Sequence, residues 1–173
     1  MGQPSLRTHD FRERLAYSEE ASGDEFWEAV YRKAFPDMIG QVPSMGNTQA
    51  QRLGIDRFVH LSSGRTLRID EKKREKVYPD ILLEVVSVDT SGAPGWMEKD
   101  LQIDYLAYAF MPIRTAYLFD WPMLRRAWLA KKEEWTSRFG TKKAPNAGYW
   151  TISVPVPIRE LRAAVASASM IEV

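Results

Sequence analysis

The residues most able to do chemistry lie in two short segments, Gly54-Ile55-Asp56-Arg57 and Ile69-Asp70-Glu71-Lys72-Lys73-Arg74. Two carboxylates that converge beside a lysine suit a metal-dependent phosphodiesterase. Mg²⁺ (or Mn²⁺) takes oxygen ligands, activates water and neutralises charge on a phosphate, and a lysine can orient or deprotonate the attacking water. We therefore expect Asp56 and Asp70 to bind a metal ion and Lys72 to complete the catalytic set.

Strand geometry decides which of these side chains can meet. Side chains alternate between the two faces of a strand, so Asp70 and Lys72 project from one side while Glu71 and Lys73 project from the other. If residues 55–61 and 66–73 pair as a hairpin, Asp56 comes close to Asp70 and Lys72. Glu71 would then offer its backbone carbonyl as a further metal ligand, with its side chain turned away.

A second register is open, because Glu71-Lys72-Lys73 is also an acid-x-Lys triplet. We favour Asp70 with Lys72, since Leu67 and Ile69 then fill the opposite, core-facing side of the strand. A third interpretation needs no site: a strand that ends in many charges is also typical of an exposed strand end that discourages edge pairing.

The two segments resemble the motifs of the PD-(D/E)xK nuclease superfamily, and the order of elements over about residues 22–120 looks like its core of helix, three strands, helix and strand. The resemblance implies a DNA-cleaving enzyme with the metal on Asp56 and Asp70 and with Lys72 as the catalytic lysine. It departs from the motif at Gly54-Ile55, where the family has Pro-Asp; Pro79-Asp80 follows the lysine instead. The family often adds an acid from the first helix, for which the candidates are Glu19, Glu20, Glu25 and Glu28.

Three more charged residues are assigned around this centre. Glu84 interrupts an apolar run, and a buried carboxylate is costly unless it is paired or metal-bound. It either joins the metal ligands or forms an ion pair with Arg57, Arg68 or Lys99. Arg57 and Arg74 are expected to bind phosphate. The basic stretches 65–76 and 122–143 could hold further phosphates or could be solvated faces.

The elements that must position these residues follow from hydrophobic spacing and turn signals. We expect an α/β fold, restriction-endonuclease-like, with a mixed central β-sheet flanked by helices on both faces. Residues 1–21 form a flexible N-terminal segment, with a turn or two of helix around 11–17, and residues 22–173 form a single domain. The expected helices are 24–35, 96–110, 120–135 and one from Pro157; the expected strands are 55–61, 66–73, 81–88, 114–119 and 149–154; long loops cover 36–53 and 138–148. The strand over 81–88 is expected to be central and covered on both faces.

Composition removes other classes of protein. The 173 residues include no cysteine and two histidines, His9 and His60, which excludes a disulfide framework, a zinc ribbon and a multi-histidine metal cluster. No apolar run nears about 18 residues, and the polar residues 1–10, without an apolar core, are not expected to act as a secretory signal. We expect a cytoplasmic protein that does not bind a membrane, with DNA as its partner and pairing of two copies as a further expectation. The alternative to a nuclease is a catalytically inactive nucleic-acid- or protein-binding protein on the same fold, associated with a phage or with defence.

Overall fold

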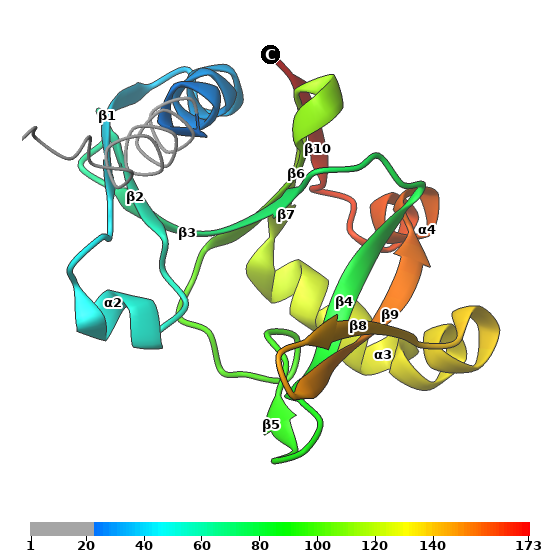
Figure 1. The fold of residues 1–173 in the computed structure, drawn as a ribbon. Helices are drawn as coiled ribbons and strands as arrows, with labels where there is room; N and C mark the ends of the chain where they lie inside the picture. Colours follow the sequence, from blue (N-terminus) through cyan, green and yellow to red (C-terminus); the bar gives the residue numbers. More distant parts are fainter. Residues whose placement is uncertain (1–22) are drawn as a thin grey trace, which may run out of the picture.

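The computed structural model describes residues 23–173; the expectations for residues 1–22, including Glu19 and Glu20, lie outside the described residues. The architecture is mixed α/β, as expected (Figure 1). A helix over 23–34 comes first, and the remaining elements are β1 (Met38–Pro43), α2 (Thr48–Arg52), β2 (Arg57–Leu61), β3 (Thr66–Arg74), β4 (Asp80–Val88), β5 (Ala93–Pro94), β6 (Tyr105–Phe110), a 3-10 turn η1 (Met111–Ile113), β7 (Thr115–Asp120), α3 (Trp121–Phe139), β8 (Lys142–Asn146), β9 (Tyr149–Pro157), α4 (Ile158–Ala164) and β10 (Ser169–Glu172).

A curled six-stranded sheet in the order β1-β2-β3-β6-β7-β10 forms the centre of the fold (Figure 1). β3 and β6 run parallel, whereas the other neighbours are antiparallel. The expected hairpin of β2 and β3 is confirmed, with Arg57 opposite Ile69 and Val59 opposite Leu67. This pairing, closed by the turn at 62–65, brings the two acidic segments of the sequence together.

Apolar side chains of alternating parity build a core on each face of this sheet. The helix over 23–34 packs Phe26, Trp27, Val30 and Tyr31, all fully buried, against Ile69 and its neighbours on one face. Burial of each such side chain stabilises the fold by about 1.5–3 kcal/mol. The other face packs against α3 and the second sheet through a cluster that includes Leu106, Tyr108, Phe110, Phe119, Leu124, Trp128, Leu83 and Val156.

The expected helix over 96–110 is wrong: residues 105–110 form the strand β6. The spacing of Leu101, Tyr105 and Ala109 imitates a helix, but Leu106 and Phe110 enter one core while Ala109 enters the other. A strand buried on both faces has a continuous apolar run, which periodicity alone does not separate from a buried helix. β6, rather than β4, is therefore the central strand with both faces covered.

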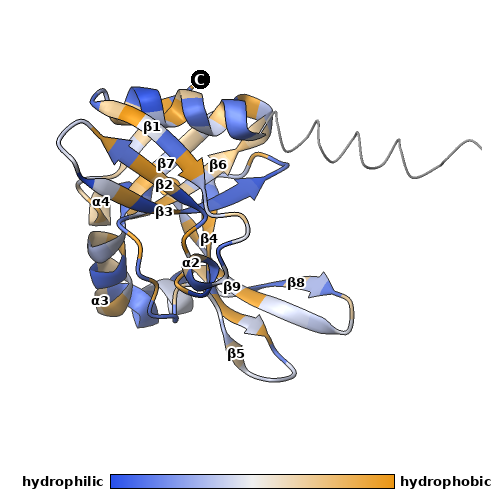
Figure 2. Ribbon diagram, turned by 90° about the vertical axis from the view of Figure 1, so that its left-hand side faces the viewer, coloured by the Kyte–Doolittle hydropathy of each residue, from blue (hydrophilic) through white to orange (hydrophobic). Residues whose placement is uncertain are grey.

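β4 instead belongs to a second sheet, in the order β5-β4-β9-β8. Ile81 and Leu83 on β4 are fully buried, whereas Leu82 and Glu84, on its other face, are half-buried and line a cavity. The connection from β3 to the parallel strand β6 runs through β4 and β5, so this sheet takes the place of the expected crossover helix. Figure 2 shows β5 and the β8–β9 hairpin projecting from the body of the molecule.

The expected loop over 36–53 is also wrong, because it contains β1 and α2. β1 pairs with β2 as the edge of the large sheet, and the Asn47 side chain caps α2 by accepting a hydrogen bond from the Ala50 N–H at 3.0 Å. Ser44 is buried, and its hydroxyl donates to the carbonyl of Ile55. Residues 44–53 thus hold Ile55 and Asp56, which come just before the start of β2.

The C-terminal part follows the sequence more closely. Asp120 caps α3 by accepting from the Met123 N–H, as expected, and α3 extends to Phe139 rather than to about residue 135. The expected loop over 138–148 contains β8, which pairs with β9, and β10 adds an unexpected edge strand beside β7. Within residues 23–173 no helix is both long enough and apolar enough to cross a bilayer.

Candidate active site

Asp70 occupies an unusual position in the middle of β3. Its side chain is 3% exposed, and Oδ1 accepts an ion-paired hydrogen bond from Nζ of Lys72. Oδ2 is buried and has no hydrogen-bond partner in the part of the chain that the structure describes. A buried carboxylate oxygen without a partner is costly, so Asp70 has a place for one more positively charged or proton-bearing group.

Asp56 reaches Asp70 from the residue just before β2. Its backbone N–H donates to the carbonyl of Ile69 at 2.9 Å, and its Oδ2 accepts from the Glu71 N–H at 2.8 Å. Gly54 makes this approach feasible: it has φ +78°, and a Cβ there would lie 2.7 Å from the side chain of Leu101. The sequence Gly-x-Asp therefore has a local structural reason, a left-handed turn packed tightly against a neighbouring loop.

The environment of Asp70 perturbs its ionisation. Burial raises the pKa of Asp70 to about 7, against the lowering effect of Lys72, and the adjacent Asp56 carboxylate adds to the increase. Near neutral pH this carboxyl group is therefore present in both its protonated and its ionised form. A strongly perturbed acid in a cavity, with specific charged neighbours, is typical of functional sites.

Asp56, Asp70 and Lys72 line one cavity of about 220 Å³. Arg52 and Lys99 stand at the same cavity and supply positive charge beside the two carboxylates. The structure thus brings together the three residues that the sequence indicated, on the side of β3 that faces away from the helix over 23–34.

Glu71 and Arg57 lie on the opposite side of β3 and β2. The Arg57 Nε–H donates to Glu71 Oε1 at 2.5 Å, its Nη2 donates to Asp24 Oδ1 at 2.7 Å, and its Nη1 donates to Gln41 Oε1. Tyr31 also donates its hydroxyl to Glu71 Oε1, at 2.8 Å. Burial raises the pKa of Glu71, and Arg57 opposes that increase.

This network corrects the expectation for Arg57 and agrees with the expectation that the side chain of Glu71 turns away from Asp70. The side chain of Arg57 is 4% exposed and its N–H groups already have partners, so the expectation that it binds phosphate is wrong. The carboxylate of Glu71 is committed to Arg57 and Tyr31, away from Asp70, which leaves only its backbone carbonyl as a ligand on that side. Sequence reasoning missed the network, although Arg57 shares the inward face of β2 with Val59 and Leu61, a signal for a buried charge.

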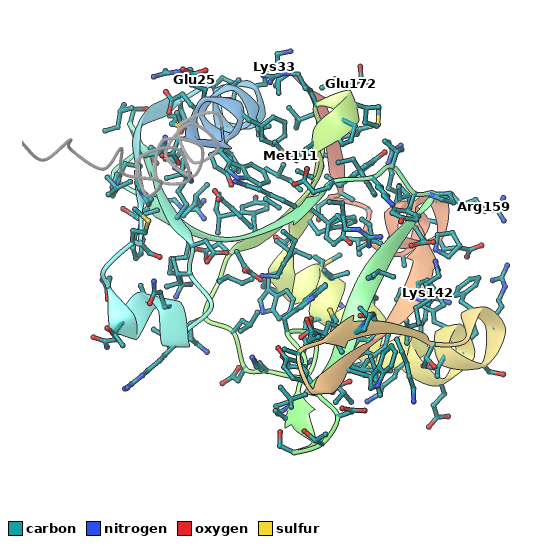
Figure 3. The ribbon with its side chains drawn as sticks, viewed as in Figure 1. Glu25, Lys33, Met111, Lys142, Arg159 and Glu172 are labelled. Atoms are coloured by element: carbon teal, nitrogen blue, oxygen red, sulfur yellow. The ribbon has the colours of Figure 1, made fainter. Side chains whose placement is uncertain are left out.

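The other proposed acids do not reach Asp70. Glu25 is exposed on the outer side of the first helix (Figure 3), and Glu28 pairs with Arg32 at 2.6 Å. Asp24 is the acid of this helix that approaches β3, but it contacts Arg57. Among residues 23–173 no three acidic or histidine side chains are grouped to hold a metal ion, so the expectation that Glu84 joins Asp56 and Asp70 is wrong.

Glu84 has no ion pair in the described part of the chain either, which corrects the alternative expectation of a bridge to Arg57, Arg68 or Lys99. Arg68 pairs with Asp104 instead, at 3.0 Å. Glu84 lines a second cavity, of about 400 Å³, which also contains Lys72 and Arg74. Arg74 donates to the Tyr108 hydroxyl at 2.9 Å and lies 4.4 Å from the centre of the Tyr78 ring.

The two carboxylates that remain fit a small divalent cation. Mg²⁺ is usually bound by one or two protein carboxylates, with water and substrate phosphate as the other ligands. Asp70 offers a buried oxygen that lacks a partner, and Asp56 is exposed beside it, open to solvent and substrate. Both are hard oxygen donors, which suit Mg²⁺ or Mn²⁺ better than a softer metal.

Comparisons with known proteins leave the family open. No family model matches the chain, and no curated protein matches it. Among solved structures the chain is similar to a nuclease from a fusselovirus, with 13% sequence identity over 94% of this chain and 95% of that chain and a TM-score of 0.33. A likeness at this TM-score carries no weight for function, which has to be inferred from the chain's own residues.

Proposed function

We propose that this protein is a metal-dependent nuclease that hydrolyses DNA phosphodiester bonds, with Mg²⁺ or Mn²⁺ held by Asp56 and Asp70. The observation that supports it best is the partnerless buried oxygen of Asp70, next to a second carboxylate and a lysine in one cavity. If these residues served only stability, the folded state would be more stable with a hydrogen-bond donor on that buried oxygen.

The residues of the chain divide the work of such a reaction. A bound divalent cation supplies Lewis acidity toward the phosphate and toward water. Asp70 releases its proton near neutral pH and so becomes available as a ligand, while the Glu71 N–H fixes the orientation of Asp56. The Lys72 ammonium, held beside Asp70, orients the attacking water or stabilises the negative charge that develops on the phosphate oxygens in the transition state. Arg52 and Lys99 attract the polyanionic substrate.

Cleavage of single-stranded and duplex DNA with and without Mg²⁺ tests the proposal. Wild type is compared with Asp70→Asn, which keeps the volume of the side chain, and with Glu25→Gln as a matched control on the exposed face of the first helix. We expect Asp70→Asn to lose activity by about 10²-fold or more, with an unchanged circular dichroism spectrum, while Glu25→Gln cuts like wild type.

Two results would contradict the proposal. Equal cleavage by wild type and Asp70→Asn would separate the reaction from this carboxylate. Binding of DNA without cleavage in any divalent metal would instead indicate the inactive nucleic-acid-binding protein that is the alternative function.

A further inference from the structure

The cavity next to the candidate active site has a chemistry of its own. It measures about 400 Å³ and shares Lys72 and Trp96 with the smaller cavity that contains Asp56 and Asp70. The two cavities therefore adjoin at Lys72, between the end of β3 and the second sheet. A strand whose phosphate reached Asp70 would have room to extend into this neighbouring space.

Three basic residues, Lys72, Lys73 and Arg74, line the second cavity, and Lys72 is paired with Asp70. The Arg74 guanidinium is held in place by the Tyr108 hydroxyl and by the Tyr78 ring, and it has no ion pair within residues 23–173. A guanidinium that is oriented but lacks an acidic partner is ready to bind an anion, and its planar fork matches a phosphate. Arg74 lies two residues after Lys72 on the same side of β3, so this anion site follows directly on the active site.

The part of the cavity wall formed by β4 carries a free acceptor. Glu84 is half-buried on β4, directly across from Ser153 on β9, and neither an ion pair nor a side-chain hydrogen bond engages its carboxylate in the described part of the chain. The backbone holds this wall in place, because the Met97 N–H donates to the Glu84 carbonyl at 3.0 Å and a Cβ at Gly95 would collide with that carbonyl.

A carboxylate repels phosphates, so Glu84 is unsuited to the backbone of a nucleic acid. Its carboxylate is suited to accept a hydrogen bond from the exocyclic amine of a base. The nearby aromatic residues Trp96 and Tyr108 are 7% and 3% exposed and give the cavity an apolar floor. β8 and β9 contribute the lining residues Ala144, Asn146, Thr151 and Ser153, and the Asn146 amide is held by the Ala144 carbonyl and the Thr151 hydroxyl.

We propose that this cavity, which we call the Arg74–Glu84 subsite, binds an unpaired nucleotide that flanks the cleaved bond, with its phosphate on Arg74 and an amine-bearing base toward Glu84. A duplex exposes only the groove edges of its stacked and paired bases, so a whole base enters a cavity only when it is flipped out or single-stranded. The substrate class that follows is a DNA single strand, or a single-stranded part of a branched molecule, rather than intact duplex. This inference rests on the proposed nuclease function for the position of the cleaved bond.

Fluorescence anisotropy with labelled oligonucleotides tests the subsite without cleavage, in the Asp70→Asn background and in EDTA. We expect single strands to bind more tightly than the matching duplex, and oligo-dC or oligo-dA more tightly than oligo-dT. Arg74→Gln should weaken binding about tenfold for all sequences and lower the salt slope by about 1. Arg159→Gln, at an exposed position on α4 (Figure 3), is the matched control and should bind like the parent.

Glu84→Gln separates base recognition from simple charge. Removal of a negative charge raises affinity for every oligonucleotide, whereas loss of a base contact shrinks the preference for dC and dA over dT. A smaller preference ratio supports the subsite; an unchanged ratio, or duplex bound as tightly as single strand, overturns it. These binding measurements are independent of catalysis. If the protein cuts DNA but shows neither the single-strand preference nor the change of base preference in Glu84→Gln, the proposed subsite is wrong and the nuclease function stands. Strand binding with the expected pattern but no cleavage in the wild type would remove the nuclease function and leave the subsite.

Discussion

The two sides of β3 bury neighbouring acids in opposite ways. On the side of the first helix, Glu71 is surrounded by Arg57 and Tyr31, and its charge is compensated within the fold. On the other side, Asp70 keeps one buried oxygen without a partner, and its pKa rises to about 7. Residues of the same chemical type, adjacent in the sequence, therefore have different consequences: a compensated acid stabilises the fold, and an uncompensated one is available for chemistry.

Replacing the lysine of each acid-x-Lys triplet in turn tests most directly which side of β3 carries the active site. We expect Lys72→Met to reduce cleavage by about 10²–10⁴-fold, because its ammonium contacts Asp70, and Lys73→Met to retain most activity. Steady-state cleavage rates of both variants, measured at equal DNA concentration, decide between the registers. The reverse pattern would move the active site to the Glu71 side of β3.

The free energy of unfolding should depend on the Glu71 side of β3 rather than on the Asp70 side. Glu71→Gln leaves the buried Arg57 with Asp24 as its remaining acidic partner, and loss of one member of a buried ion pair is strongly destabilising. We expect a loss of about 3 kcal/mol in unfolding free energy, measured by urea denaturation. Glu75→Gln, at an exposed position just beyond β3, should change stability by less than about 0.5 kcal/mol. Equal effects of the two substitutions would show that the network adds nothing to stability.

The pH dependence of stability tests the uncompensated acid, Asp70, directly. The pKa of Asp70 rises from 3.8 to about 7 on folding, so the folded chain binds this proton more tightly than the unfolded chain. The resulting stabilisation is complete below pH 4 and is lost as the pH rises through about 7, and its size is at most about 4 kcal/mol. Urea denaturation in EDTA between pH 4 and pH 7.5 should therefore show Asp70→Asn gaining stability relative to wild type as the pH rises. Parallel curves for the two proteins would contradict a raised pKa at Asp70.

The parts of the fold that could be predicted from sequence are those with local signals. The β2–β3 hairpin has alternating residues around a tight turn, and α3 begins at Asp120-Trp121-Pro122, which combines a cap with a proline in the first turn. The order of the acids along this hairpin was enough to place Asp56, Asp70 and Lys72 around one cavity.

The rest depends on contacts between distant residues. β6 looks helical from its spacing because a strand covered on both faces loses its alternation, and β1 and α2 are too short to leave a clear pattern. Burial of the Arg57 guanidinium depends on the partners Asp24 and Gln41, which are 33 and 16 residues away in the sequence. Burial of a charge with partners of this kind is a tertiary property, which periodicity does not report.

The parallel pairing of β3 with β6 links the site to the folding of the whole molecule. Ile69 lies opposite Tyr105, so the strand that carries Asp70 gains its second neighbour only through a contact that closes the whole intervening segment, including β4 and β5, into a loop. Closing so long a loop is slow, and a chain that has formed only the local hairpin leaves its carboxylates in water with ordinary acidity. Affinity for a divalent cation would then belong to the completed fold alone, and a cation that binds there would slow unfolding and raise the melting temperature.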